Sequence, residues 1–155
     1  FLHTGLGGKR TPRPLHEWRS WLSCFDVVQM NKDEYGLLTE TPDGPRGFKD
    51  LLAAGPRVAS VTFGSGGVIV AYRVNGRTFV EEVTVKRKLG DPTGCGDVWG
   101  AVMCGRLLAG MTPVASAHVA NRVAAESVDH KGIEGLTNRL ADASRDILGD
   151  SFINL

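Results

Sequence analysis

The sequence predicts an α/β protein with a mainly parallel sheet, and two observations favour this fold class. Short apolar runs of the β-branched type occur at residues 26–30 (DVVQM) and 58–63 (VASVTF), as in strands buried on both faces of a parallel sheet. Elsewhere apolar residues recur at helical spacing, most clearly over residues 98–108. A chain of 155 residues with 42% hydrophobic residues is long enough to bury a core, so residues 1–155 are expected to form a single domain.

The first elements follow from local signals. Residues 1–14 are rich in glycine and basic residues and are interpreted as a loop. Pro14 suits the first turn of a helix, and that helix, of about ten residues, has its apolar positions at Leu15, Trp18, Leu22 and Phe25. After the first strand, Asn31 is placed to cap a helix that ends near residue 38, and a further helix is expected over residues 47–54.

The middle of the chain predicts a crossover and a hairpin. The second strand completes a β-α-β unit, which is right-handed in almost all proteins. A glycine-rich turn follows it at residues 64–67. The pair Asn75-Gly76 is a strong hairpin signal, so residues 68–74 and 77–85 are expected to be antiparallel strands.

Helices occupy the rest of the chain. The first turn of one is expected at residues 96–98. Thr112 and Pro113 have the N-cap and N1 preferences that begin the next helix, which is expected to end at Gly132. A last helix is expected over residues 136–148, because its leucines and other apolar residues lie on one stripe.

Charge and composition exclude several function classes. The formal net charge is +1, and Lys86-Arg87-Lys88 is the one dense basic cluster, which argues against a nucleic-acid partner. No apolar run is long enough to span a membrane, and no part of the chain has the pattern of a signal peptide. Three cysteines without CxxC spacing indicate reduced thiols, so a cytoplasmic protein is expected.

The chemistry of the chain is concentrated in residues 89–101 (LGDPTGCGDVWGA). Gly94 and Gly96 permit a positive φ and let an anion approach the backbone closely. The free amides and the dipole of the helix that begins here favour a bound phosphate. Asp97 lies in the first turn, where its carboxylate is positioned to accept a proton from an attacking hydroxyl. The alternative is a surface turn in which Asp97 only caps the helix.

Polar residues also follow both buried strands, at the sheet edge where ligands bind in open α/β folds. Asn31 and Glu34 follow the first strand, and the turn at residues 64–67 follows the second. A structural interpretation without any ligand stays open for each of the two segments. In that interpretation Asn31 is an N-cap with acidic neighbours that complement the helix dipole, and the turn at residues 64–67 is a tight reversal.

Three motifs occur in order along the chain: Asn-x-x-Glu at residues 31–34, Thr-x-Gly-x-x-Gly at residues 62–67 and Asp-x-Thr-Gly-x-Gly-Asp at residues 91–97. With their strand and helix contexts, they resemble the C-terminal half of the ribokinase/PfkB family of sugar and nucleoside kinases. The resemblance extends over residues 23–148. It implies a ribokinase-like three-layer α/β/α fold, truncated to the ATP-binding half.

The resemblance implies catalytic roles for the third motif. Asp97 would be the base that takes the proton of a sugar hydroxyl as the hydroxyl attacks the γ-phosphate of ATP. The backbone of Gly94, Cys95 and Gly96 would form the anion hole that offsets charge on the phosphoryl group, a dominant contribution in phosphoryl transfer.

The resemblance also implies sites for the nucleotide and its ions. Asn31 and Glu34 would organise Mg²⁺ through its waters, and Asn121 takes the helix position that faces adenine. Asp91 and Thr93 would belong to a monovalent-cation site, which implies K⁺ as a further ion. The residues expected at the nucleotide itself are Thr62, Gly64, Ser65, Gly67 and Thr93.

The chain departs from the family pattern in side chains and in length. Cys95 stands where Ala is usual, Pro92 where Thr is common and Trp99 where Phe is common. The family's N-terminal half, with most of the sugar pocket, has no counterpart here, and the chain begins at Phe1 rather than Met, so a fragment is expected. A homo-oligomer or the missing half would then cover the exposed sheet edge.

The expected function is ATP-dependent phosphorylation of a sugar or nucleoside hydroxyl, with the sugar itself not specified by these residues. Two alternatives stay open. One is a non-catalytic nucleotide-binding or assembly fragment. The other interprets the glycines at 94, 96 and 100 as a dinucleotide fingerprint, although only helices follow them, whereas a fingerprint should be followed by another strand.

Overall fold

The computed structural model describes residues 16–39, 45–86, 88–130 and 134–148. The chain divides into two compact units. The first unit comprises residues 1–62 and 69–81, and the second comprises residues 63–68 and 82–155. None of the described helices is long and apolar enough to cross a membrane.

The first unit contains a β-α-β unit whose two strands are parallel. Strand β1 (Val27–Asn31) pairs in parallel with β2 (Val58–Thr62), with Val27 opposite Val58 and Asn31 opposite Thr62. The crossover between them consists of helices α2 (Lys32–Thr39) and α3 (Pro45–Ala53). This arrangement confirms the buried parallel strands predicted from the two apolar runs.

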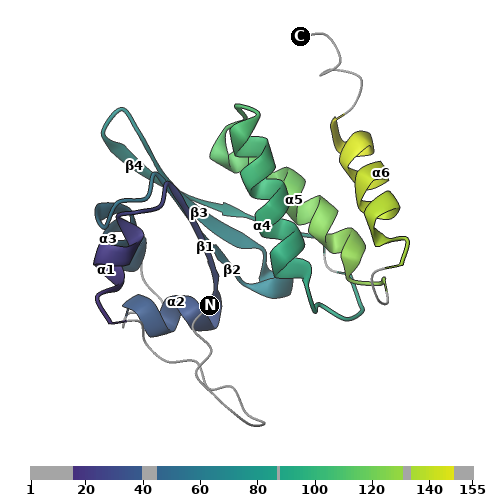
Figure 1. Cartoon of the computed structure of the whole chain (residues 1–155), viewed down its shortest axis with the longest axis horizontal. Helices are drawn as coiled ribbons and strands as arrows, with labels where there is room; N and C mark the ends of the chain where they lie inside the picture. Colours follow the sequence, from purple (N-terminus) through teal and green to yellow (C-terminus); the bar gives the residue numbers. More distant parts are fainter. Residues whose placement is uncertain (1–15, 40–44, 87, 131–133, 149–155) are drawn as a thin grey trace. The chain divides into compact units, whose positions relative to one another are not determined.

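The sheet continues beyond β2 as a meander, in the order β1-β2-β3-β4 (Figure 1). The short 3₁₀ helix η1 (Gly64–Gly66) separates β2 from β3 (Val68–Val74), and the turn Asn75-Gly76 separates β3 from β4 (Arg77–Val83). Both turn residues have positive φ, 50° and 76°, as the predicted type I′ hairpin requires. The α/β class is confirmed, and the described part of the sheet is mixed, with its parallel portion at β1 and β2.

Helices α2 and α3 bury their apolar side chains against each other and the sheet. Tyr35 of α2 stacks on Phe48 of α3 with ring centroids 5.0 Å apart, and both rings are buried together with Leu51 and Leu52. Gly47 lies against the Tyr35 ring, where a Cβ would meet the phenol oxygen. Helix α3 confirms the helix predicted at residues 47–54, although α3 begins two residues earlier, at Pro45.

The helix predicted near the start of the chain is shorter than expected. Helix α1 spans Trp18–Leu22, five residues, and Glu17 directly before it has a left-handed φ of 58°. The predicted loop and the predicted helical position Leu15 lie outside the described residues. Trp18 and Leu22 are buried as predicted, but Phe25 lies beyond the helix and is 52% exposed. The prediction of a ten-residue helix with Phe25 on its buried face was wrong.

In the described part of the second unit, helices α4 (Cys95–Leu108), α5 (Pro113–Ser127) and α6 (Leu136–Leu148) accompany η1 and the end of β4. Helix α5 packs against both α4 and α6, and the three lie side by side in Figure 1. The Thr112 side chain accepts a hydrogen bond from the amide of Ala115 (3.3 Å), and Pro113 is the first helical residue, which confirms the predicted start of α5. Gly132, the predicted end, lies outside the described residues.

Candidate functional site

The turn before α4 is shaped by one hydrogen bond within it and by one contact with the end of α5. The amide of Thr93 donates to Asp91 Oδ1 at 2.9 Å, and hydrogen bonds from the hydroxyl and the amide of Thr93 hold the pKa of Asp91 below its usual range. Upstream, Gly90 lies so close to the Val128 carbonyl that a Cβ would overlap it. The residues predicted for a monovalent-cation site therefore form one Asx turn.

The first turn of α4 exposes backbone amides beside a carboxylate. Gly94 precedes the helix with φ 82°, and its carbonyl accepts from the amides of Asp97 and Val98, both at 3.1 Å. The amide of Cys95 donates to the Pro92 carbonyl at 3.1 Å. Of the three predicted anion-hole residues, Gly94 and Gly96 retain amides with no hydrogen bond to any described residue. Asp97 is exposed in the same turn.

The Gly64–Gly67 loop is tightly folded within the second unit. The amide of Gly67 donates to the Gly64 carbonyl at 3.1 Å, and the Phe63 amide donates to the Gly67 carbonyl at 2.9 Å. Gly64 and Ser65 are exposed. A Cβ on Gly67 would lie 2.5 Å from the Val83 carbonyl oxygen. The loop therefore rests on the end of β4, and Gly67 permits that close approach.

Asn121 is buried in the second unit, and its amide is fully engaged. Its side chain is 6% exposed. Its Oδ1 accepts from Trp99 Nε1 at 2.7 Å, and its Nδ2 donates to the carbonyls of Val83 and Thr84, each at 3.1 Å. We call Trp99, Asn121 and the two carbonyls the Asn121 network. The sequence singled out Asn121 as a residue facing adenine but did not indicate these partners.

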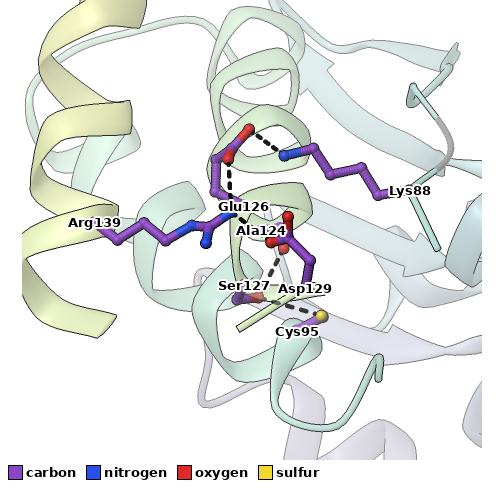
Figure 2. Close-up of polar contacts among 7 residues, drawn as sticks. All are labelled: Lys88, Cys95, Ala124, Glu126, Ser127, Asp129 and Arg139. Carbon is purple, nitrogen blue, oxygen red and sulfur yellow. Dashed lines mark hydrogen bonds and ion pairs between the residues drawn. The ribbon is translucent and has the colours of Figure 1, made fainter. Parts of the chain in front are cut away.

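The C-terminal part of α5 holds the chain on either side of the α4 turn through charged and polar side chains (Figure 2). Glu126 pairs with Lys88 at 2.6 Å and with Arg139 of α6 at 3.4 Å, and Arg139 also pairs with Asp129. We call these four residues the Glu126 ion-pair network. Hydrogen bonding to Lys88 lowers the pKa of Glu126 despite partial burial, and hydrogen bonding to Arg139 lowers the pKa of Asp129.

Cys95 also contacts α5. Its Sγ lies 3.2 Å from Ser127 Oγ, and the Ser127 hydroxyl donates to the Ala124 carbonyl at 2.7 Å (Figure 2). Sequence reasoning missed Ser127 and the Glu126 ion-pair network. Neither has a signature in the sequence, because each depends on a contact between segments that are far apart along the chain.

Asn31 and Glu34 lie in the first unit and form a reciprocal pair. The Asn31 amide donates to Glu34 Oε2 at 2.8 Å, and the Glu34 amide donates to Asn31 Oδ1 at 2.9 Å. This is the geometry of a capping box at the start of α2, so the N-cap interpretation of Asn31 is confirmed. Thr62, at the end of β2, is the parallel partner of Asn31.

The structure thus distributes the predicted site residues between the two units. Asn31, Glu34 and Thr62 lie in the first, and the loop at 64–67, the turn at 91–97 and Asn121 lie in the second. Within the second unit, the Asn121 network connects the loop to α4. Among the described residues, no group of three or more His, Cys, Asp or Glu side chains is arranged to hold a metal ion.

Comparison with solved structures supports the same fold. A pyrophosphate-dependent kinase in the ribokinase family, in a sulfate complex, superposes with a TM-score of 0.69 at 23% identity, over 86% of this chain and 46% of that one. A putative ribokinase II from E. coli in complex with ATP and Mg²⁺ gives 0.66 at 20% identity, over 84% and 41%. Fructokinase from Vibrio cholerae O395, with fructose, ADP and calcium bound, gives 0.62 at 25% identity, over 76% and 39%.

The chain therefore spans less than half the length of each of these kinases. No curated protein matches its sequence. Residues 9–138 match the sequence profile of the pfkB family carbohydrate kinases. This match extends over most of the chain and includes all three motifs, and we conclude that the chain belongs to the pfkB family of carbohydrate kinases.

Proposed function

We propose that this chain carries the phosphoryl-donor site and the catalytic base of an ATP-dependent kinase that phosphorylates a sugar or sugar-like hydroxyl. The observation that carries the proposal is the first turn of α4. There the amides of Gly94 and Gly96, which have no hydrogen bond to any described residue, share one helix N-terminus with the exposed carboxylate of Asp97. An anion-binding backbone next to a proton acceptor is what phosphoryl transfer to a hydroxyl requires.

Each group in this turn has a separate task in the proposed reaction. Asp97 accepts the proton of the attacking hydroxyl, so that the oxygen reaches phosphorus with a free lone pair. The amides of Gly94 and Gly96 donate to the phosphoryl oxygens, where they offset developing charge without reorganisation. The dipole of α4 acts in the same direction, because its positive end lies at this turn.

The Gly64–Gly67 loop is proposed to contact the nucleotide together with Thr62 and Thr93. Its exposed Gly64 and Ser65 offer backbone and hydroxyl groups with little steric hindrance. Among known structures, the ribokinase II complex contains ATP and Mg²⁺, and the fructokinase complex contains ADP. These similarities support ATP as the donor. Pyrophosphate is the competing donor, because a similar kinase is pyrophosphate-dependent.

Mg²⁺ is compatible with the oxygen donors of Asn31 and Glu34 in the first unit. The capping box engages Asn31 Oδ1 and Glu34 Oε2, and Glu34 Oε1 has no hydrogen bond to any described residue. Amide and carboxylate oxygens suit Mg²⁺, which commonly keeps several waters. When bound, the ion would neutralise phosphate charge. Asp91 and Thr93 are proposed for K⁺, with Asp91 Oδ1 already committed to the Asx turn.

We further propose a cytoplasmic setting and an association with another chain. Cys24, Cys95 and Cys104 are all free thiols, as in a reducing compartment. Strands β1 and β4 are the edges of the described sheet, and edge strands favour pairing with a second copy or a further half of the kinase. Light scattering of the purified chain measures this association.

Calorimetric titration separates the proposed kinase from its alternatives. Mg-ATP is expected to bind this chain, whereas NADH, titrated in parallel, is not. Binding of NADH alone would favour a dinucleotide-binding module. Titration of pyrophosphate identifies the donor. Binding of Mg-ATP by a complete kinase that includes the sugar-binding half, without phosphorylation of ribose, fructose or myo-inositol, would favour the non-catalytic alternative.

The role of Asp97 is tested by Asp97→Asn. In a complete kinase that includes the sugar-binding half, we expect loss of phosphoryl transfer by at least about 100-fold, the scale of general-base catalysis, with an unchanged dissociation constant for Mg-ATP. Asp33→Asn is the matched control, because Asp33 is an exposed aspartate in the first turn of α2. Retained turnover in Asp97→Asn would overturn the assignment of the base.

A further inference from the structure

The amide of Asn121 has no hydrogen available for a ligand. Both hydrogens on Nδ2 are donated to the carbonyls of Val83 and Thr84, and Oδ1 accepts from Trp99 Nε1. The side chain is 6% exposed, and Trp99 is 3% exposed. A hydrogen bond donated by this amide to an adenine ring would require the bond to Val83 or the bond to Thr84 to break, and the Val83 carbonyl is buried.

One of these hydrogen bonds is accepted by the Val83 carbonyl oxygen, the atom against which the Gly64–Gly67 loop packs. The Val83 carbonyl oxygen accepts from Asn121 Nδ2 at 3.1 Å, and the same oxygen lies 2.5 Å from the position of a Cβ on Gly67. Gly67 therefore rests directly on the carbonyl that Asn121 holds. A displacement of Val83 would be transmitted to the loop, because close-packed atoms leave no space to absorb it.

The other end of the network lies on α4. Trp99 is two residues beyond Asp97 in the same helix and donates its indole N–H to Asn121. The Asn121 side chain of α5 therefore contacts both α4 and the strand end at Val83 against which the Gly64–Gly67 loop packs. All of these residues belong to the second unit.

We infer that Asn121 is a positioning residue, which holds the Gly64–Gly67 loop in register with the first turn of α4 through Val83 and Trp99. This role rests on the proposed function only in that it identifies the loop as the nucleotide site. It replaces direct contact with adenine as the reason for an asparagine at this position. The network also explains why a tryptophan, and not a phenylalanine, serves at position 99, because only the indole can donate to Oδ1.

The inference is tested by amide hydrogen exchange, which requires no nucleotide. Asn121→Ala removes both donors to the carbonyls of Val83 and Thr84, and exchange of the hydrogen-bonded amides in residues 63–67 should become about tenfold faster. Trp99→Phe removes only the indole donor, and the same amides should exchange about threefold faster. Peptides from α3 in the first unit should be unchanged in both variants.

Ser116→Ala is the matched control on the same helix. Ser116 is fully buried in α5, and its hydroxyl has no hydrogen-bond partner among the described residues, so its removal should leave exchange in the loop unchanged. Unchanged exchange in the loop of Asn121→Ala would overturn the inference. An equal acceleration in α4, α5 and the loop would also overturn it, because that pattern indicates a general loss of stability.

Trp99→Phe decides the matter if Asn121→Ala does not fold, since it keeps the amide and its two carbonyl contacts. Unchanged exchange in the loop of that variant would then overturn the inference. Addition of Mg-ATP to the wild-type chain tests the proposed function separately. Absence of protection at residues 63–67 would count against a nucleotide site there and would leave the positioning role of Asn121 intact.

Discussion

Two glycines of the candidate nucleotide loop share a positive φ but not the same surroundings. Gly64 has φ 58° and no atom of the described residues within 4 Å of its Cβ position, whereas Gly67 has φ 93° and the Val83 carbonyl oxygen at 2.5 Å. The backbone at Gly67, with ψ −147°, is close to a region that only glycine adopts readily. The motif makes both residues look alike, and the structure distinguishes them.

This difference predicts unequal effects of two alanine substitutions. Gly64→Ala should lower the free energy of unfolding by about 1 kcal/mol, the cost of a left-handed alanine. Gly67→Ala should lower it by about 3 kcal/mol, because steric overlap adds to backbone strain. Urea denaturation of both variants measures the two losses. Equal losses would mean that Gly67 does not rest on Val83.

At the scale of single elements, two residues at the start of helix α2 have both a capping role and a proposed role in Mg²⁺ binding. Asn31 and Glu34 satisfy each other's backbone amides, and this accounts for both residue types without any ligand. Stability alone therefore cannot reveal whether Glu34 also acts on Mg²⁺. A substitution that preserves the capping box and removes the charge separates the two roles.

Glu34→Gln is that substitution, because glutamine serves in a capping box as well as glutamate does. We expect its free energy of unfolding to be within about 0.5 kcal/mol of wild type, while the Mg²⁺ concentration required for half-maximal ATP binding rises. Asn31→Ala is the comparison, with an expected loss of about 1 kcal/mol from the missing cap. An unchanged Mg²⁺ requirement in Glu34→Gln would remove Glu34 from the metal site.

Helix α5 holds the chain from the last residue of β4 to the first residue of α4 at several points. Asn121 binds the carbonyls of residues 83 and 84, Glu126 pairs with Lys88, and Ser127 contacts Cys95. The carbonyl of Val128, the residue that follows α5, lies against Gly90. The candidate phosphate-binding turn is therefore placed by α5 as much as by α4.

The Glu126 ion-pair network makes part of this placement dependent on pH. The pKa of Glu126 is lowered from 4.5, chiefly by Lys88. A carboxylate whose pKa is lowered by folding stabilises the protein above its unfolded pKa, and that contribution is lost as the pH falls through the lowered value. Glu126→Gln should reduce stability at pH 7 by at most about 1 kcal/mol, as for a partly exposed pair.

Urea denaturation as a function of pH checks this sign. The difference between wild type and Glu126→Gln should be constant above pH 4.5 and should shrink as the pH falls below that value. Glu81→Gln on the exposed strand β4 is the control for removal of a carboxylate. A difference that grows on acidification would contradict the stabilising role of the network.

At the scale of the whole molecule, the sequence predicted those features that depend on local signals. The bounds of β3, the Asn75-Gly76 turn and the start of α5 follow from turn and capping chemistry, and each agrees with the structure. The family and its fold class followed from three motifs in order, and both are confirmed. The catalytic and binding roles of the motif residues stay predictions.

What the sequence could not predict depends on contacts between distant segments. Trp99 and Asn121 are 22 residues apart, and Asn121 and Val83 are 38 residues apart. Two of the partners are backbone carbonyls, which every residue has and which leave no pattern in the sequence. The short α1 was missed for a different reason, because helical spacing does not reveal that Glu17 adopts a left-handed conformation.

A buried tryptophan in the second unit provides a test of nucleotide binding by the whole chain. Trp18→Phe with Trp21→Phe leaves Trp99 as the one tryptophan, so its fluorescence reports unfolding of the unit that contains the Gly64–Gly67 loop. Mg-ATP at 100 times its dissociation constant should stabilise this unit by about 2.7 kcal/mol. NADH at the same concentration should leave the denaturation midpoint unchanged. A shift with NADH alone would contradict the kinase proposal.

The hydrogen bonds from Asn121 to main-chain carbonyls also determine which positions tolerate substitution. Thr84 is exposed and contributes only its carbonyl to the network, so most side chains could replace it without loss of that contact. Asn121 has no such freedom, because no other residue supplies two donors and one acceptor in the same space. Substitutions should therefore be tolerated at Thr84 and be rare at Asn121.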